Sequence, residues 1–343
     1  MKLLTERESE VLKAIVHDYI MTGKPVGSRS FVQKYSFSIS PATMRNIMFD
    51  LENMGYLTHP HTSAGRIPTD QGYRYYVNYL SDSYNLTSLE EVTIRDDFLR
   101  NEVHLDKLFI LVSRMLAGVS KLAGIVLTPN PDFTVVKQVE LIQLDYNAIL
   151  IIFVTRTGIV INKKVMISEA VSREDLYRAS AFLSTELAGY SLADIRDTVL
   201  PTLRTKYSEM DRQLCLDIVE LAVSALDEQS VFIEGIENIL HIPEMIDKDA
   251  LSGFLRLIEE KKNLSAIMIK GMEADEVRTM IGSEIDESYV SGCSLVASSY
   301  KIGNRNAGVL GIIGPTRMNY GKVVPLVDYT GKLVTNFLTR VSK

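Results

Sequence analysis

The sequence predicts an α+β protein with several domains, in which an N-terminal helical unit precedes a larger body of antiparallel strands and helices. Its 343 residues are enough for two or three domains with separate cores. Apolar residues recur at helical spacing through residues 5–55. Short apolar runs between turn residues, typical of antiparallel strands, mark 135–167 and 266–314, and the pattern between these two regions is mostly helical.

The charge of the chain is distributed unevenly. The whole sequence has 37 basic and 43 acidic side chains, a net charge of −6. Residues 1–80 hold 9 Lys and Arg against 7 Asp and Glu, a net +2, and the remainder hold 28 against 36, a net −8. A weakly basic end permits binding of a polyanion there, but the acidic total argues against a nucleic-acid-binding surface over the whole protein.

The cysteines and the N-terminus indicate the compartment. Cys215 and Cys293 are far apart and form no CxxC pattern, so they predict buried thiols in a reducing compartment. The first ten residues are charged, and no apolar run approaches the length of a membrane span. We therefore expect a cytoplasmic protein with no signal peptide and no membrane partner.

Two helices begin the chain. Thr5 and Glu8 have the spacing of a capping box, an apolar stripe follows, and Gly23 ends this first helix. A second, short helix is expected over residues 26–35, with Ser28 as its N-cap.

A third helix follows after only four residues. Ser40 is the expected N-cap, Pro41 takes the first helical position, and Gly55 stops the helix. At 100° per residue, one face is apolar and belongs to the core: Met44, Ile47, Met48, Leu51 and Met54. The opposite face, with Thr43 at its border, is directed outward: Ala42, Arg45, Asn46, Phe49 and Asn53.

A short helix, a tight turn and a capped helix with a small, polar first turn are typical of a helix-turn-helix motif. In that motif the second helix enters the major groove of DNA with its N-terminal residues at the base edges. Ala42 is small enough for close approach, and Arg45 and Asn46 are residue types that make bidentate contacts to guanine and adenine. The alternative is an ordinary three-helix bundle that shows its outer face to solvent.

A two-stranded ribbon after this helix favours the first interpretation. Strands are expected at 56–59 and 66–68, joined by a small polar tip, and a further helix follows. Such a ribbon is a wing, and Gly65 and Arg66 in it suit close approach to a phosphate backbone or a minor groove. A plain hairpin with a surface arginine remains the alternative.

The run SPATMRNIMFDLENMGYLTHPHTSAGRIPTDQGYRYYV, residues 40–77, closely resembles the signature of the bacterial heat-inducible transcription repressor HrcA family. The run AGVLGIIGPTRMNYGKVVPLV, residues 307–327, is similar to that family's C-terminal signature, so the resemblance covers the whole chain. Glu52 also occupies a family position. Met44 stands where isoleucine is common, and Phe49 is not part of the family pattern. The candidate DNA-binding residues are Ser28, Arg29, Ser40, Ala42, Thr43, Arg45, Asn46, His61, Thr62, Ser63, Gly65 and Arg66.

The rest of the chain divides by pattern. Residues 81–100 begin with a polar, aperiodic stretch and are expected to be a linker, and an apolar helix follows over about 105–119. Strands are expected at 135–145, 148–154 and 158–167, then helices at 173–188, 207–227 and 249–260, with a strand at 231–236 among them. Strands return at 266–270, 293–301 and 307–314 before a final helix.

The family resemblance implies how these parts assemble. It implies a winged-helix DNA-binding domain at 1–80 and a GAF-like domain built from 101–171 and 261–343, whose first and last strand sets pair. Residues 172–260 would be an inserted, mainly helical dimerising domain. The resemblance also implies a homodimeric repressor that binds an inverted-repeat operator in double-stranded DNA before chaperone genes and whose activity is supported by the chaperonin GroEL.

Catalytic and metal sites find little support in the sequence. Gly308, Gly311 and Gly314 are not followed by GK[ST] and do not have the GxGxxG spacing. Cys293 has no histidine near it in sequence, and His59 and His61 have no further ligand nearby. We therefore expect no enzyme activity, no cofactor and no metal. Two alternatives stay open: a winged-helix regulator controlled by a small-molecule effector in the GAF-like domain, and an enzyme with a DNA-binding unit.

One argument for chaperonin dependence does not need the resemblance. The mean hydropathy is +0.07, the chain has 13 methionines, and the expected sheet pairs strands that are about 100 residues apart. Such a sheet folds slowly and exposes apolar surface meanwhile. The fraction of chains that reach the folded, active state is therefore a candidate for the property that is regulated.

Overall fold

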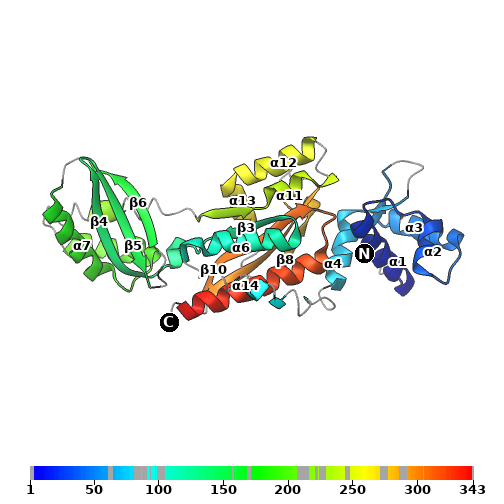
Figure 1. Cartoon of the computed structure of the whole chain (residues 1–343), viewed down its shortest axis with the longest axis horizontal. Coiled ribbons are helices and arrows are strands. Elements are labelled where there is room, and N and C mark those ends of the chain that lie inside the picture. The colour runs from blue at the N-terminus through cyan, green and yellow to red at the C-terminus, as the bar shows by residue number, and fades with distance from the viewer. Residues whose placement is uncertain are drawn as a thin grey trace.

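The computed structural model describes residues 4–60, 65–80, 86, 91–92, 94–96, 98, 105–156, 158, 160–167, 171–206, 216–220, 223, 229–243, 248–270, 277–285, 292–303 and 305–341. They form three units in a row (Figure 1). The N-terminal unit is residues 4–80, the central unit is 105–133 with 229–341, and the distal unit is 134–223. No helix in these ranges is long and apolar enough to cross a membrane.

The N-terminal unit consists of four helices and a short ribbon, as expected. Its elements are α1 (Glu6–Thr22), α2 (Ser28–Tyr35), α3 (Pro41–Asn53), β1 (Leu57–Thr58), β2 (Ile67–Pro68) and α4 (Asp70–Leu80). The capping box of Thr5 and Glu8 is present, and Gly23 ends α1 in the left-handed conformation at φ 66°. The ribbon pairs antiparallel, with Leu57 opposite Pro68.

The two remaining N-cap predictions have different outcomes. The hydroxyl of Ser40 accepts a hydrogen bond from the Thr43 N–H at 3.0 Å, with Pro41 in the first turn, as expected. The prediction for Ser28 is wrong, because Gly27 is the N-cap of α2 and no side chain caps that helix. Ser28 already has helical backbone as the first residue of α2, so its hydroxyl is past the capping position.

The central unit is built on a five-stranded antiparallel sheet with the order β7-β3-β10-β9-β8. The strands are β3 (Ala123–Leu127), β7 (Val231–Glu234), β8 (Arg278–Ile281), β9 (Cys293–Ile302) and β10 (Arg305–Pro315). The helices around it are α6 (Leu105–Ser120), η1 (Pro131–Phe133), α11 (Ile236–Leu240), α12 (Lys248–Glu259), α13 (Lys261–Ile269), η4 (Gly282–Glu284) and α14 (Tyr320–Val341). Helices α6 and α14 contact each other and the sheet.

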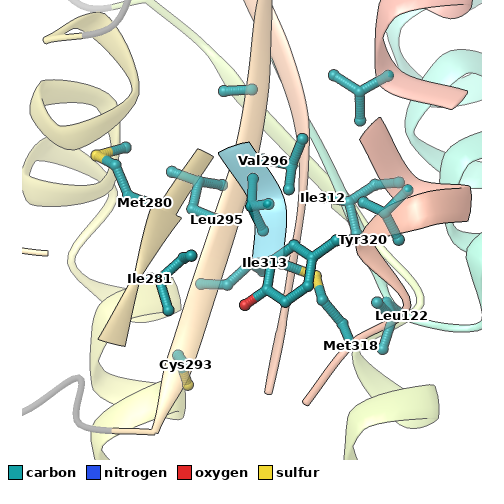
Figure 2. Close-up of a cluster of buried hydrophobic side chains, with 14 of the residues drawn as sticks. Leu122, Met280, Ile281, Cys293, Leu295, Val296, Ile312, Ile313, Met318 and Tyr320 are labelled. Carbon is teal, nitrogen blue, oxygen red and sulfur yellow. The ribbon is translucent and has the colours of Figure 1, made fainter. Parts of the chain in front are cut away.

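Figure 2 shows the core where this sheet meets the start of α14. Leu295 and Val296 of β9 lie beside Ile312 and Ile313 of β10, and all four are buried. Tyr320 is buried among them and donates a hydrogen bond from its hydroxyl to the carbonyl of residue 316 at 2.8 Å. The apolar runs at 293–301 and 307–314 are therefore strands, as expected.

The distal unit has its own sheet, of order β4-β5-β6, and its own core. Its elements are β4 (Val136–Asp145), β5 (Ala148–Thr155), β6 (Val160–Met166), α7 (Arg173–Leu187), α8 (Leu192–Asp194), η2 (Ile195–Val199) and α9 (Leu200–Lys206). The expectation that these three strands pair with the last strands of the chain is wrong. Short connections let them pair locally, and α7 to α9 bury their apolar face without help from the central sheet.

The strand that does pair with the C-terminal region is β3, which was not expected as a strand from the sequence. Leu310 of β10 lies opposite Val126 of β3. The run AGIVL begins two residues after the end of α6, and all five of its residues are buried. In the sequence, its apolar residues look like a continuation of the apolar helix before it, so the pattern does not mark a separate strand. A boundary at residue 171 therefore divides the distal unit, because β4 to β6 and α7 share one core.

Two further segments differ from expectation. A strand was expected at 266–270, but residues 266–269 belong to helix α13, whose buried residues Leu264, Ile267 and Met268 have helical spacing. Within the expected linker, the described residues 91–92, 94–96 and 98 are helical. Ile94 and Phe98 are buried, and the Phe98 ring is 5.4 Å from that of Phe337 in α14. Most of the expected helix at 207–227 lies outside the described residues.

Candidate DNA-binding surface

Helix α3 presents the face that its sequence predicts. Met44, Ile47, Met48 and Leu51 are buried in the N-terminal unit. The outward residues are exposed: Ala42, Thr43, Arg45, Asn46, Phe49 and Asn53. The first turn and a half of α3 is therefore open to a partner, with Arg45 and Asn46 side by side in sequence on its exposed side.

Phe49 is the one large apolar side chain on that face. It is 56% exposed, so it does not pack beneath the ribbon. An apolar ring left in solvent one turn after Arg45 gains hydrophobic contact only when a partner covers it.

An open pocket of about 440 Å³ lies between the first turn of α2, the middle of α3 and the base of the ribbon. Three arginines line it, one from each element: Arg29, Arg45 and Arg66. Ser28 and Ser30 also line it. Arg29 and Arg45 form no ion pair with any residue that the structure describes.

The pocket also receives the N-terminus of α2. Because Gly27 offers no capping side chain, the N–H groups of the first turn of α2 are not satisfied by a cap. A helix N-terminus carries a partial positive charge that adds to the charge of the arginines. The pocket is therefore suited to an anion.

Arg66 also has a partner within the protein. One of its terminal nitrogens is 2.7 Å from Oε2 of Glu52, near the end of α3, and its side chain is 24% exposed. Oε1 of Glu52 also contacts Nδ1 of His59, just after β1. Glu52 thus ties both sides of the ribbon to α3, and Arg66 serves first to position the ribbon. The spacing of Glu52 along α3 gave no signal for this role.

Gly65 also has a structural reason to be glycine. A Cβ at this position would lie 2.5 Å from the backbone carbonyl oxygen of Val26. This approach allows Val26 and Arg66 to exchange two backbone hydrogen bonds, at 2.8 and 2.9 Å. The glycine therefore permits contact between the ribbon and the α1–α2 connection, and its proposed approach to DNA stays a prediction.

The remaining wing residues proposed from the sequence, His61, Thr62 and Ser63, lie outside the described residues.

The possible catalytic groups are buried. Cys293 is completely buried, and this burial raises the pKa of its thiol to about 12. The thiol is therefore neutral at physiological pH and is a poor nucleophile. Gly308, Gly311 and Gly314 all lie within the buried strand β10, so they do not form a phosphate loop.

Comparison with known proteins places this surface in context. The family model of the HrcA protein C terminal domain matches residues 106–324. The heat-inducible transcription repressor HrcA of Geobacter sulfurreducens is 39% identical over 337 residues, 98% of each chain. The protein of the same name from Leptospira biflexa is 34% identical over 344 residues, 99% of each chain. A crystal structure described as a hypothetical protein has a TM-score of 0.68 at 22% identity and covers 99% of this chain and 100% of its own.

Proposed function

Because this chain belongs to the HrcA family of heat-inducible transcription repressors, we propose that its N-terminal unit binds an inverted-repeat operator before chaperone genes. The observation that carries this proposal is the arrangement of α3 beside the arginine-lined pocket. Transcription repressors are not enzymes, and the buried thiol of Cys293 is consistent with that class. A repressor acts on the chromosome, so we place the protein in the cytoplasm.

In the proposed complex, α3 lies in the major groove. Arg45 and Asn46 then reach base edges, because both are exposed in the first half of the helix. Ser40, Ala42 and Thr43 form the first turn, where short side chains allow the helix to approach the bases. Phe49, further along the same face, is placed to contact a thymine methyl group.

The pocket beside α3 is the proposed phosphate site. Arg29 and the first turn of α2, with Ser28, bind a backbone phosphate and set the register of α3 in the groove. The ribbon, held to α3 through Glu52 and Arg66, then lies along the adjacent backbone as a wing. Contacts from His61, Thr62 and Ser63 at its tip are part of this proposal.

We propose that the distal unit makes the dimer. One face of its sheet packs on α7 to α9, while the other carries apolar residues without a cover in the described part of the chain. Leu150 lies opposite Ile142, and Val154 lies opposite Val160, so these side chains form one face. Ile142 and Val160 are 46% and 45% exposed. A second copy of this face would bury both patches symmetrically.

These features also revise the proposed domain limits. The winged-helix domain remains at about 1–80, and the dimerising domain becomes residues 134–223 because β4 to β6 belong to its core. The GAF-like domain is then residues 105–133 with 229–341.

The same topology supports the proposal that a chaperonin assists the repressor. Leu310 and Val126 are neighbours in the central sheet although 184 positions separate them in the chain. The whole distal unit lies between them, so this pairing forms late and leaves apolar strands exposed. GroEL is the proposed partner for that stage.

The experiment that tests the function uses the full chain and duplexes from upstream of the chaperone genes of its own genome. Footprinting should show protection of an inverted repeat, and a duplex with one half-site scrambled should bind much more weakly. Equal affinity for the scrambled duplex would contradict operator recognition.

A further inference from the structure

The distal sheet has two opposite charges on the face that is turned away from α7, which we call the outer sheet face. Residues directly opposite each other in an antiparallel sheet have their side chains on the same face. Two neighbouring rows across the three strands lie on the outer sheet face: Glu140, Ile152 and Asn162 in one row, and Ile142, Leu150 and Lys164 in the next. The alternate residues of these strands, such as Leu141, Ile151 and Val165, are buried in the distal core.

Glu140 and Lys164 have no ionic partner in the part of the chain that the structure describes. Lys164 is exposed, and it forms no hydrogen bond or ion pair with a described residue. Oε1 of Glu140 accepts a hydrogen bond from the neutral side-chain amide of Gln138 at 2.7 Å. Strand β5 lies between the two charges, which are therefore about 10 Å or more apart across the sheet.

A second copy on the outer sheet face would remove both charges from water. Burial of an unpaired carboxylate or ammonium group is strongly unfavourable, whereas an opposite charge within the interface offsets that cost. Arrangements of the two copies that leave Glu140 and Lys164 unpaired are therefore disfavoured relative to one that pairs them.

Two-fold symmetry allows both charges to be paired at once. In such an interface, if one residue contacts a second residue of the other copy, the reciprocal contact is also present. The register places the point midway between Glu140 and Lys164 over β5, between Ile152 and Leu150. A two-fold axis that lies in the interface and crosses β5 at this point exchanges the positions of the two charges.

We propose that Glu140 forms an ion pair with the partner's Lys164, twice in each dimer, and that these pairs set the orientation of the two copies. This inference rests on the proposed dimerising role of the distal unit and adds the residues that select the partner. Apolar contact supplies affinity, whereas the charges decide which orientation and which chain are accepted. The orientation in turn determines how the two N-terminal units are placed on the operator.

Charge reversal in the full-length protein tests the pair. In a dimer of Glu140→Lys chains two lysines meet at each junction, and in a dimer of Lys164→Glu chains two glutamates meet. Like charges in contact repel, so each single variant should self-associate about tenfold or more weakly than the parent in analytical ultracentrifugation. A melting curve verifies that each variant folds.

A mixture of the two single variants restores opposite charges at both junctions. Chains of Glu140→Lys and Lys164→Glu should therefore form heterodimers well above the statistical share, measured by native mass spectrometry with a tag on one of them. A double variant with both reversals in one chain should recover the self-association of the parent. Operator affinity should be low for each single variant and close to the parent's for the mixture, because affinity depends on linked N-terminal units.

Two residues of α7, which packs on the other side of the sheet, provide matched controls. Arg173 and Glu174 are adjacent and exposed in the first turn of that helix. Arg173→Glu and Glu174→Lys should each dimerise like the parent, and their mixture should contain only the statistical share of heterodimers.

Two results would overturn the inference. One is a statistical share of heterodimers in the mixture of Glu140→Lys with Lys164→Glu, while each variant alone dimerises like the parent. The other is loss of dimers in both single variants that neither mixing nor the double variant restores. Ile142→Asp distinguishes these failures from failure of the proposed dimer. A monomeric Ile142→Asp chain keeps the outer sheet face as the interface, whereas a dimeric one places the interface elsewhere.

Discussion

Arg74 of α4 and Glu284 of η4 form a two-point ion pair across the boundary between the N-terminal and central units. Nε of Arg74 is 2.7 Å from Oε1 of Glu284, and a terminal nitrogen contacts Oε2. Two further contacts reinforce the boundary. The carboxylate of Asp70 accepts hydrogen bonds from Ser283, and Arg317 donates to the carbonyl of Ile20 at 2.9 Å. Together they hold α3 and the pocket in one orientation relative to the central unit.

This boundary should respond to acid. Burial acts to raise the pKa of Glu284, but hydrogen bonds from Arg74 and the Ile281 N–H hold the pKa below its ordinary value. Ionised Glu284 therefore adds stability above its ordinary pKa of about 4.3, and that stability is lost as the pH falls through the lower folded value. Glu284→Gln should lower the free energy of unfolding at neutral pH, and the difference from the parent should shrink toward zero below about pH 4.

Urea unfolding of the two proteins across that pH range measures this difference. Glu237→Gln, at an exposed glutamate of α11, is the matched control and should have little effect at any pH. A difference for Glu284→Gln that stays constant with pH would contradict the role of its charge.

Sequence selectivity should depend on Arg45, while Arg29 should contribute mainly general affinity. Arg45→Ala removes a proposed base contact and should cost about 1–3 kcal/mol on the operator and reduce the preference over random DNA. Arg29→Ala removes a proposed phosphate contact, so it should weaken binding to operator and random DNA similarly. It should also reduce the slope of the logarithm of the binding constant against the logarithm of salt concentration by about 1.

Fluorescence anisotropy at several salt concentrations separates the two effects. Arg7→Ala, at an exposed arginine of α1 outside the pocket, is the control for loss of one positive charge. Equal loss of affinity for operator and random DNA in Arg45→Ala would show that Arg45 does not read bases.

Glu52→Gln tests the positioning of the wing, because its electrostatic effect on DNA binding and its effect on the ribbon are expected to have opposite signs. Removing a negative charge next to DNA should by itself strengthen binding. We expect weaker operator binding instead, because Arg66 and His59 lose the carboxylate that holds the ribbon to α3. Titration with operator DNA, beside a melting curve to verify folding, measures this. Unchanged or tighter binding would mean that the ribbon does not need Glu52.

Dimerisation should be lost when a charge is placed on the apolar face of the distal sheet. Ile142→Asp should give a monomer by analytical ultracentrifugation, since an unpaired carboxylate would be buried at the proposed interface. Operator affinity should fall by about a hundredfold or more because the two N-terminal units are no longer linked. Val341→Asp, at a similarly exposed apolar residue at the end of α14, should remain dimeric. A dimer of normal affinity in Ile142→Asp would place the interface elsewhere.

Recovery of active repressor after unfolding should depend on chaperonin. The protein is unfolded in denaturant and diluted with GroEL, its co-chaperonin and ATP, or with an inert protein instead. Active DNA-binding sites are then titrated over time. We expect a larger active fraction with chaperonin, because pairing of β3 with β10 must await the distal unit. Rapid and complete spontaneous recovery would remove this mechanism.

Local patterns in the sequence determined the N-terminal unit to a large extent. The caps at Thr5 and Ser40, the buried face of α3 and the ribbon after it are all as the sequence predicts. Each depends on interactions within a few residues, so the pattern and the structure have the same physical cause. The exposed Arg45 and Asn46 follow directly from helix geometry.

Only the tertiary structure decided which strands share a sheet and which side chains meet. The apolar runs of β3 and α13 fit more than one secondary structure, because a short apolar segment has no clear period and its partners select its conformation. Glu52 meets Arg66, and Val26 meets the backbone beside Gly65, only after the ribbon folds back onto α2 and α3. Those contacts join residues that are distant in sequence, and packing, which depends on the whole fold, brings them together.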